Sequence, residues 1–417
     1  MHYFQTFDCV ETHPKIFNQL GYHTQIIAKL HVGPPRVYPF SIRNEQHTRD
    51  GQWIASKLED GITRCQTEDV PFFSTIGFID PHRDGSRGGF GNNKDWPSIE
   101  KHEYDPKDVH VPPFVTDLPE VRKELAGYYQ AIDRMDQGIG MVMQVLERKG
   151  VLDSTLVVFV SDNGPPFVNS KTTLYDAGVR LPCVMRCPSK KPGTRNPNLI
   201  SYVDLLPTFL DYAGANTISS SNPPGTERPG RSILPILDVE QDHEAWDHIF
   251  GSHTFHETSA YYPTRVLRTR KYKYHRNIAW QLPFPFGTDL YGALSFEAMR
   301  NHQPEGPGAV KIGERPLKDF IHRPAELLFD IANDPMELHN LAEEKEYEGV
   351  VGEMRNKLEQ WQRDTGDQWL FRDGLSLGLV GRHIANGCKV PDRWDFDVEK
   401  PGSNDCVLVK KQDRVHR

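Results

Sequence analysis

The stretch Leu156-Val157-Val158-Phe159-Val160-Ser161-Asp162-Asn163-Gly164 decides the expected fold. Its run of five apolar residues predicts a strand buried on both faces, as in a parallel sheet that helices cover. The run stops at Asp162 and Asn163, whose side chains offer hard oxygen ligands suited to Ca²⁺ or Mg²⁺. The same residues are common in turns. A metal site here therefore depends on the residues at the ends of the neighbouring strands, because ligand sites lie beyond the carboxyl ends of such strands.

The composition is that of a globular protein that can bury a large core. The chain has 417 residues, of which 37% are hydrophobic and 25% charged, with a net charge of −8. This length predicts two domains. The acidic balance gives no reason to expect a nucleic acid or an anionic membrane as a partner, and no apolar run approaches the ~20 residues of a transmembrane helix.

The first residues and the cysteines leave the compartment open. Residues 1–8 show neither the basic nor the apolar region of a signal peptide, and the chain has no Asn-x-Ser/Thr sequon. Both observations weakly favour an intracellular protein. The six cysteines are too few and too scattered for a disulfide scaffold, and none forms a Cys-x-x-Cys pair.

Polar residues also come directly after two earlier strands. Lys29 and His31 come after a predicted strand at residues 24–28, and Asp80, His82 and Arg83 come after one at residues 72–79. Lys171 follows the Asp162 strand by a short loop. Because the carboxyl ends of parallel strands share one edge, we expect these side chains to converge on a single rim of the sheet.

A long amphipathic helix connects the second and third of these strands. Asp117-Leu118-Pro119-Glu120 has the spacing of a capping box, and Lys149-Gly150 ends the helix. One apolar stripe is expected to pack on the sheet, at Val121, Leu125, Tyr128, Ile132, Met135, Ile139, Val142 and Leu146. Strand, helix and strand in this order predict a right-handed parallel unit.

The pattern changes in the second half of the chain. Residues 215–230 are expected to form an exposed linker, and residues 249–252 the last strand of the large sheet. A hairpin at residues 262–276, a strand at 326–330 and a helix at 350–361 then indicate a smaller α+β domain. We therefore expect an α/β domain over residues 1–262 and an α+β domain over residues 263–417. The basic residues of the hairpin are interpreted first as a solvated face and second as an anion-binding surface; they are Arg265, Arg268, Arg270, Lys271, Lys273 and Arg276.

Each candidate site residue is ordinary alone, since a single histidine is more often structural than catalytic and a single lysine is usually a surface charge. Together they combine an acid–amide pair for a hard cation with two imidazoles and two ammonium groups. A tetrahedral oxyanion with spread negative charge requires such a set. Hydrolysis of sulfate esters and of phosphate esters both fit.

Motifs along nearly the whole chain resemble the sulfatases of the alkaline-phosphatase superfamily, and in particular the N-sulfoglucosamine sulfohydrolase (sulfamidase) branch. The Ser161-Asp162-Asn163-Gly164 element is general to sulfatases. Two other elements, Asp80-Pro81-His82-Arg83 and Lys29-x-His31-Val32-Gly33-Pro34, point to the sulfamidase branch. The resemblance rests on residues 27–34, 78–83, 104–109, 134–138, 160–164, 251–252, 256–257, 329–330, 334–335 and 340–342.

The resemblance implies a role for each candidate residue. Asp162 and Asn163 would bind Ca²⁺, with Mg²⁺ as the alternative, and Lys29 and Lys171 would hold the sulfate oxygens. His31 would orient the nucleophile, and His82 would protonate or stabilise the leaving group. Arg83, His256 and Glu257 would contact the substrate.

The resemblance also implies a fold and a substrate. The implied fold is a large, mostly parallel sheet between helices with a smaller C-terminal domain, and the implied substrate is a small sulfated sugar or a sulfate ester. The resemblance leaves a homodimer open, and family members are lysosomal or secreted.

One departure from the family is serious. Sulfatases begin with a strand that ends in an Asp-Asp metal pair, followed by a Cys-x-Pro/Ala-x-Arg motif whose cysteine becomes formylglycine. The chain contains neither Asp-Asp nor this motif, and Cys187-Pro188-Ser189-Lys190 is only its nearest imitation. We expect the chain to start after these elements and to turn over sulfate esters poorly, because covalent catalysis needs an activated nucleophile. Two alternatives stay open: a phosphoryl hydrolase of the same superfamily, which would bind two metal ions instead of one, and an anion-binding homologue that has lost catalysis.

Overall fold

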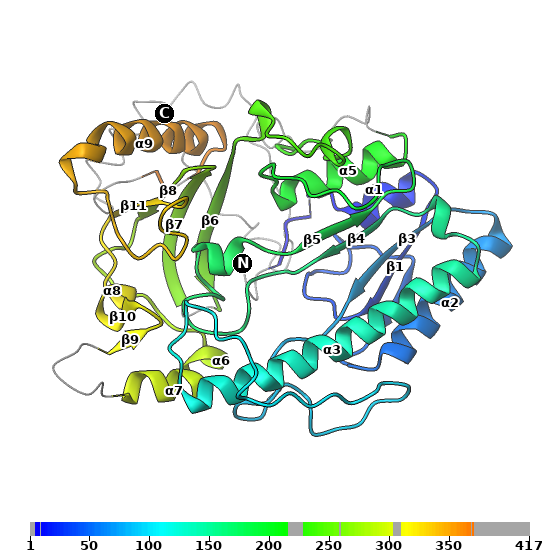
Figure 1. The fold of residues 1–417 in the computed structure, drawn as a ribbon. Coiled ribbons are helices and arrows are strands. Elements are labelled where there is room, and N and C mark those ends of the chain that lie inside the picture. Colours follow the sequence, from blue (N-terminus) through cyan, green and yellow to red (C-terminus); the bar gives the residue numbers. More distant parts are fainter. Residues whose placement is uncertain are drawn as a thin grey trace, which may run out of the picture.

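The computed structural model describes residues 5–8, 10–215, 228–257, 260–302, 310–367 and 369–370. Within these residues the strands form a three-stranded sheet, a separate two-stranded pair, a four-stranded sheet and one further short pair. Figure 1 shows the two-stranded pair β4–β5 between the three-stranded sheet and the four-stranded sheet. The α/β class with a C-terminal α+β part is confirmed. Across the described part of the chain, no helix is both long and apolar enough to cross a membrane.

The first sheet is parallel and has the order β2-β1-β3. Its strands are β1 (His23–Ala28), β2 (Ile42–Glu45) and β3 (Phe72–Gly77). The predictions of β1 and β3 are confirmed, whereas β2 is not among the predicted strands. Ala28 pairs with Gly77, so both strands end at the same edge and deliver their following residues to one rim.

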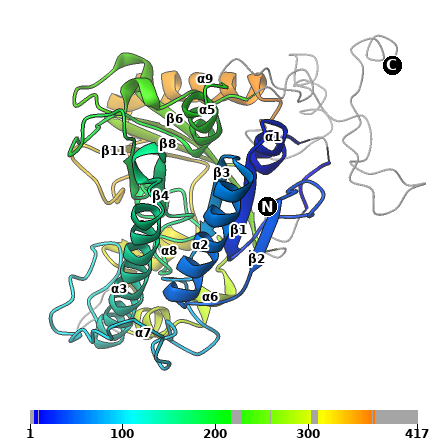
Figure 2. The ribbon, with the colours of Figure 1, turned by 90° about the vertical axis from the view of Figure 1, so that its right-hand side faces the viewer.

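Helices cover both faces of this sheet. α1 (His13–Gln19) and α5 (Leu205–Tyr212) pack on the face that presents Phe73. α2 (Gly51–Glu68) and α3 (Pro119–Arg148) pack on the face that presents Phe72 and Ile76. Figure 2 shows α2 and α3 side by side along this face. Alternate residues of one strand therefore enter opposite cores, as a strand covered on both sides requires.

A glycine contact sets the close approach of α2 to α3. A Cβ atom on Gly51 would lie 2.7 Å from the Cα of Gly138, and a Cβ on Gly138 would lie 2.9 Å from the Phe78 ring. Neither position has room for a larger side chain. The glycine of the Arg134–Gly138 motif thus has a packing role.

The Asp162 strand differs from the expectation. Among the described residues, β4 (Val157–Val160) pairs only with β5 (Cys183–Arg186). The pairing is antiparallel, and every residue of β4 is half-buried. Within the described part of the chain β3 and β4 belong to separate sheets. The predictions of a β4 buried on both faces and of one parallel unit through β3, α3 and β4 are therefore wrong.

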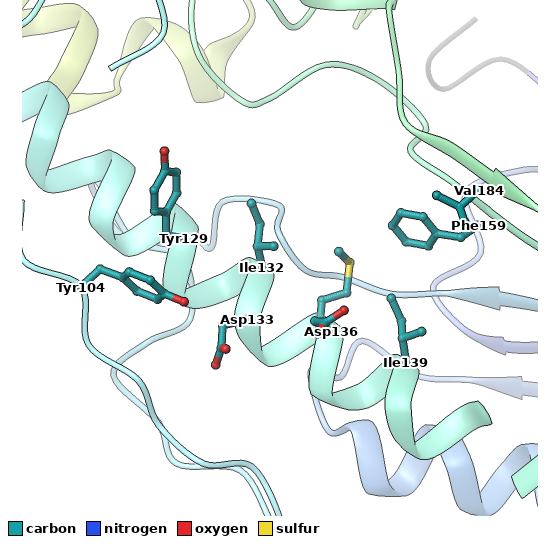
Figure 3. Close-up of a pocket in the computed structure, with 9 residues that line it drawn as sticks. Tyr104, Tyr129, Ile132, Asp133, Asp136, Ile139, Phe159 and Val184 are labelled. Carbon is teal, nitrogen blue, oxygen red and sulfur yellow. The ribbon is translucent and has the colours of Figure 1, made fainter. Parts of the chain in front are cut away.

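The separation of β3 from β4 also changes the environment of α3. The ends of its apolar stripe are buried, but Ile132, Met135 and Ile139 in the middle face a cavity of about 710 Å³. Phe159 and Val184 line the opposite side of this cavity (Figure 3).

The capping-box prediction for the start of α3 is wrong. Leu118 is the N-cap, and Asp117 instead pairs with Arg122 at 2.5 Å.

The second sheet is antiparallel with the order β11-β8-β7-β6. Its strands are β6 (His248–His256), β7 (Ala260–Thr269), β8 (Tyr272–Asn277) and β11 (Glu326–Asp330), and α9 (Glu348–Asp364) packs on it. The predicted hairpin, strand and helix are confirmed. β6 pairs with β7, so the prediction that residues 249–252 close the large sheet is wrong. A domain division after residue 262 would cut across this paired sheet, and we propose a division before His248 instead.

The remaining helices and strands are short. They are α4 (Asp176–Val179), α6 (Thr288–Tyr291), α7 (Leu294–Asn301), α8 (Leu317–Ile321), β9 (Lys311–Ile312) and β10 (Arg315–Pro316). One apolar core runs from the first half of α3 through α7 and α8 to β11. Most of the predicted linker at residues 215–230 lies outside the described residues.

The basic residues of the β7–β8 hairpin are largely buried in ion pairs. Lys273 is fully buried and pairs with Asp176 at 2.7 Å and with Glu337 at 3.1 Å. Arg265 pairs with Asp367 at 2.6 Å. The interpretation of this cluster as a solvated face is wrong, because the hairpin packs between α4 and α9 and its cations meet carboxylates from both sides.

Candidate active site

Most of the candidate residues predicted for one rim of a single sheet lie close together, but they follow strands of two separate sheets. Lys29 directly follows β1 and Asp162 follows β4, and their charged groups lie 3.6 Å apart. Asn163 is next to Asp162 and donates its amide Nδ2 to the Gly164 carbonyl at 2.8 Å. His31 lies exposed on the loop after β1. Strands of two separate sheets therefore deliver a cation and a carboxylate to one place.

His82, Lys171 and a third residue, Asp289, form the centre of the site. The Lys171 ammonium lies 3.3 Å from His82 Nε2 and donates to Asp289 Oδ2 at 2.5 Å. His82 Nδ1 lies 2.7 Å from the Arg83 carbonyl. Because a carbonyl only accepts, Nδ1 carries the proton and Nε2 is left to accept from Lys171. The Lys171 side chain is 8% exposed, so this ammonium is held in place and poorly solvated. We refer to Lys29, His82, Asp162, Lys171 and Asp289 as the rim cluster.

The charges of the rim cluster act on one another. Partial burial lowers the pKa of His82 below its usual value, and the nearby Lys171 and Lys29 lower it further, against the Arg83 carbonyl and Asp289, which raise it. The imidazole is therefore neutral at pH 7. Burial alone would raise the pKa of Asp289, but Lys171 and the histidines His82 and His256 lower it overall. Asp289 is therefore ionised.

A buried ion cluster fixes the loop that carries His82. Asp80 accepts from Arg134 Nε and Nη2, both at 2.7 Å, and also from Arg49. Arg49 Nη2 additionally donates to the His82 carbonyl at 2.9 Å. The three side chains are at most 6% exposed. Asp80 therefore fixes the position of this loop, and Arg134 of the sulfatase-like motif holds Asp80 through two hydrogen bonds.

Arg83 points away from the rim cluster. Its guanidinium pairs with Glu124 at 2.7 Å, donates to the Pro166 carbonyl at 3.0 Å and lies over the rings of Phe90 and Phe167. Arg83 therefore has all of these contacts within the protein and packs in the interior. It is not part of the rim cluster.

His256 and Glu257 lie beside Asp289, at the end of β6. Glu257 Oε1 accepts from Thr288 Oγ1 at 2.7 Å. A Cβ atom on Gly287 would lie 3.0 Å from the His256 ring and 3.1 Å from Asp289 Oδ1. The predicted substrate-contacting pair thus adjoins the rim cluster. Sequence reasoning missed Asp289 itself, because nothing in its local sequence distinguishes it from the other aspartates of the chain.

The residues present do not complete a calcium site. Ca²⁺ takes six to eight oxygen ligands, whereas Asp162 and Asn163 supply two side chains, and the Asp162 side chain is 74% exposed and paired with Lys29. In the part of the chain that the structure describes, no three His, Cys, Asp or Glu residues gather in a way that could hold a metal ion. The predicted Ca²⁺ or Mg²⁺ site therefore stays a prediction, and we assign no chemical step to a metal.

The cysteines in the described residues do not resemble an activated nucleophile. Cys65 and Cys187 are buried, and burial raises the pKa of Cys65 and of Cys183. Cys187 contacts the Ser189 hydroxyl at 3.4 Å at the end of β5. Cys9, Cys388 and Cys406 lie outside the described residues.

The cavity beneath β4 is a separate feature. Its lining is mostly apolar and includes the carboxylates Asp133 and Asp136 but no cation (Figure 3). Asp133 already accepts from His102 at 3.1 Å and from Gln137 at 2.8 Å. An anionic substrate would find no partner there, so the rim cluster is the better candidate for the active site.

Comparison with known proteins defines the class of this site. The sequence profile of the sulfatase family matches residues 10–215, and the profile of the N-sulphoglucosamine sulphohydrolase C-terminal region matches residues 168–282. Human N-sulphoglucosamine sulphohydrolase is 34% identical over 89% of this chain and 77% of its own length. The chain belongs to the sulfatase family, whose members are sulfuric ester hydrolases that generally rely on a metal ion and a formylglycine.

A more distant sequence relative is also a sulfatase, and solved structures share the fold. An ulvan-active sulfatase of Formosa agariphila is 27% identical over 73% of this chain, which spans 53% of that protein. A structure solved in complex with its substrate D-glucosamine-2-N,6-O-disulfate superposes with a TM-score of 0.56 at 17% identity, covering 88% of this chain and 85% of that one. The phosphonate monoester hydrolase of Silicibacter pomeroyi gives a TM-score of 0.60 at 15% identity, covering 89% and 83%. The structural matches show the alkaline-phosphatase-like fold.

Proposed function

We propose that the rim cluster binds the sulfate group of a sulfated sugar, with N-sulfated glucosamine as the specific candidate. The observation that carries the proposal is the Lys171 ammonium 3.3 Å from His82 Nε2, with Lys29 close enough to lower the pKa of the same ring. Lys29 and Lys171 would hold the sulfate oxygens, and His82 would stand beside the leaving group. Support for an N-sulfated sugar comes from the human relative at 34% identity and from the matched C-terminal profile.

The charge balance favours a sulfate over a phosphate monoester. With His82 neutral, the charges of Lys29 and Lys171 are offset by those of Asp162 and Asp289. A sulfate monoester brings one negative charge, whereas a phosphate monoester brings about −1.5 to −2 at pH 7. Because the four charges of the cluster already cancel, a ligand with one negative charge upsets this balance less than a ligand with two.

Calorimetric titration with matched ligands tests the proposal. Glucosamine N-sulfate should bind, while glucosamine and glucosamine 6-phosphate should bind at least tenfold more weakly. Equal binding of the phosphate and the N-sulfate would favour the phosphoryl hydrolase alternative. Binding of neither anion would overturn the assignment of the rim cluster.

Turnover is a separate question, measured as released inorganic sulfate. Since no cysteine among the 417 residues lies in a Cys-x-Pro/Ala-x-Arg motif, we expect these residues to bind the sulfated sugar with little or no hydrolysis. A specific observation, the lack of this motif, thus keeps the anion-binding alternative open. Rapid sulfate release from glucosamine N-sulfate would show that another nucleophile exists within the chain.

A further inference from the structure

Asp289 is an unexpected residue in a site for an anion. Its carboxylate lies among the groups that would hold a sulfate, and one of its oxygens, Oδ2, accepts from Lys171 at 2.5 Å. The other oxygen, Oδ1, is buried and has no hydrogen-bond partner among the residues that the structure describes. A buried acceptor without a donor is unfavourable, because it has lost its water without gaining a partner. Such an atom in a binding site indicates that a ligand supplies the donor.

The structure holds Asp289 firmly in this position. Its neighbour Thr288 is tied to the end of β6 through Glu257, and Leu290 on the other side is buried in the core. Asp289 Oδ1 and the His256 ring both border Gly287, where a Cβ atom would lie 3.1 Å from the one and 3.0 Å from the other and would crowd both. Oδ1 therefore lies on the side of Asp289 that borders Gly287 and His256.

We propose that Asp289 determines specificity for the sugar: Oδ2 holds Lys171 beside His82, and Oδ1 accepts a hydrogen bond from an N–H or hydroxyl donor of the sugar next to the sulfate. The inference rests on the proposed function and adds to it a residue, Asp289, that recognises a hydrogen-bond donor of the sugar. A carboxylate repels the sulfate but attracts a donor, so it selects for a sugar that carries both groups. An anion without a donor gains nothing from Asp289.

The variant Asp289→Asn separates these two effects. Lys171 can only donate, so the amide oxygen of the variant turns toward Lys171 and the amide NH₂ takes the place of Oδ1. The acceptor for the sugar becomes a donor, and one negative charge disappears from the site. Affinity for glucosamine N-sulfate should fall at least tenfold, the size of a lost hydrogen bond to a charged group. Affinity for inorganic sulfate should stay or rise, because a repelling charge is gone.

The matched control is Asp153→Asn, which removes one carboxylate from an exposed position. The Asp153 side chain is 95% exposed and pairs with Arg186 at 2.8 Å, away from the rim cluster. This variant should leave both affinities unchanged. Gly287→Ala is a second test that keeps the charge of Asp289, since its added methyl group would fill the space beside Oδ1. It should weaken the sugar and spare inorganic sulfate.

Calorimetry with three probes gives the readout: glucosamine N-sulfate, inorganic sulfate and cyclohexylsulfamate, which carries the N–H without sugar hydroxyls. Loss of both organic probes in Asp289→Asn assigns the donor to the N–H, and loss of the sugar alone assigns it to a hydroxyl. If Asp289→Asn weakens sugar and inorganic sulfate equally, or neither, the specificity role is overturned while the proposed function stands.

A ligand-free measurement covers the case in which the proposed function itself fails. If the parent chain binds no sulfate at all, NMR titration of the His82 ring still tests the contact among His82, Lys171 and Asp289. The charged groups that face this ring are Lys171, Lys29 and Asp289, next to the Arg83 carbonyl. Removing the charge of Asp289 should lower the pKa of His82. An unchanged pKa would show that Asp289 does not hold the cluster.

Discussion

Substituting Asp80 by Asn should destabilise the protein far more than an ordinary surface change. The carboxylate of Asp80 is 2% exposed and is shared by Arg49 and Arg134, whose side chains are 6% and 5% exposed. An amide in its place leaves two buried guanidinium groups without a counter-charge. Breaking a buried ion pair on one side costs about 3–5 kcal/mol. We expect a loss in this range, a large part of the roughly 5–15 kcal/mol by which proteins are stable.

The measurement is urea unfolding followed by far-UV circular dichroism, with Asp117→Asn as the control. Asp117 also pairs with an arginine, Arg122, but its side chain is 55% exposed, so this pair contributes only about 0–1 kcal/mol. The variants remove the same charge and differ in burial. Adding Arg134→Met to Asp80→Asn should cost less than the sum of the single changes, because the two residues share one network. A loss below about 1 kcal/mol for Asp80→Asn would refute the view that this cluster anchors the His82 loop.

Three further predictions concern charge. Lys171→Met should reduce the affinity for inorganic sulfate at least tenfold by calorimetry, whereas Lys191→Met, at an exposed lysine, should not change it. Sulfate affinity should rise as pH falls through the lowered pKa of His82, because the ring then adds a positive charge; a pH series of titrations that shows no rise would contradict this. Burial lowers the pKa values of His13, His253 and His275 to about 4, so the unfolded chain binds more protons between pH 6.5 and 4. Unfolding free energy should therefore fall as pH drops through this window, by up to about 1.4 kcal/mol per pH unit for each ring, and a flat urea midpoint would refute the assignment.

The elements of the fold could be predicted from the sequence where their signals are local. β1, β3, α3 and the β7–β8 hairpin follow from apolar periodicity and turn residues within a few positions. Strand partners could not be predicted in the same way. The run around Phe159 is apolar enough for a fully buried parallel strand, yet β4 pairs with β5 alone, in the antiparallel direction. A strand's composition reports how apolar its surroundings are and says little about which edge it joins.

In the candidate site, too, the residues with a local sequence signal could be predicted and those brought in from a distance could not. Lys29, His82, Asp162 and Lys171 could be placed together because each follows a predicted strand or its loop. Asp289 could not, since it is 118 residues from Lys171 in sequence and belongs to the short helix α6. For the cations of the β7–β8 hairpin, the sequence predicted an exposed position where the structure shows a largely buried one. Their alternation suggested a solvated face, whereas carboxylates as remote as Glu337 and Asp367 pair with them inside the protein.

These long-range pairs explain why the smaller domain matters to a site on the larger one. Lys171 lies on the loop that leads into α4, and Asp176 at the start of α4 is held by Lys273 and Arg268 of the C-terminal sheet. Glu337 also accepts from the Asp176 backbone N–H and pairs with Lys273. The far end of the same loop is therefore fixed by buried charges. Positioned charges stabilise an anion without reorganising when it binds. In the proposed function, the C-terminal sheet would thus contribute to recognition by holding Lys171 beside Asp289 and His82.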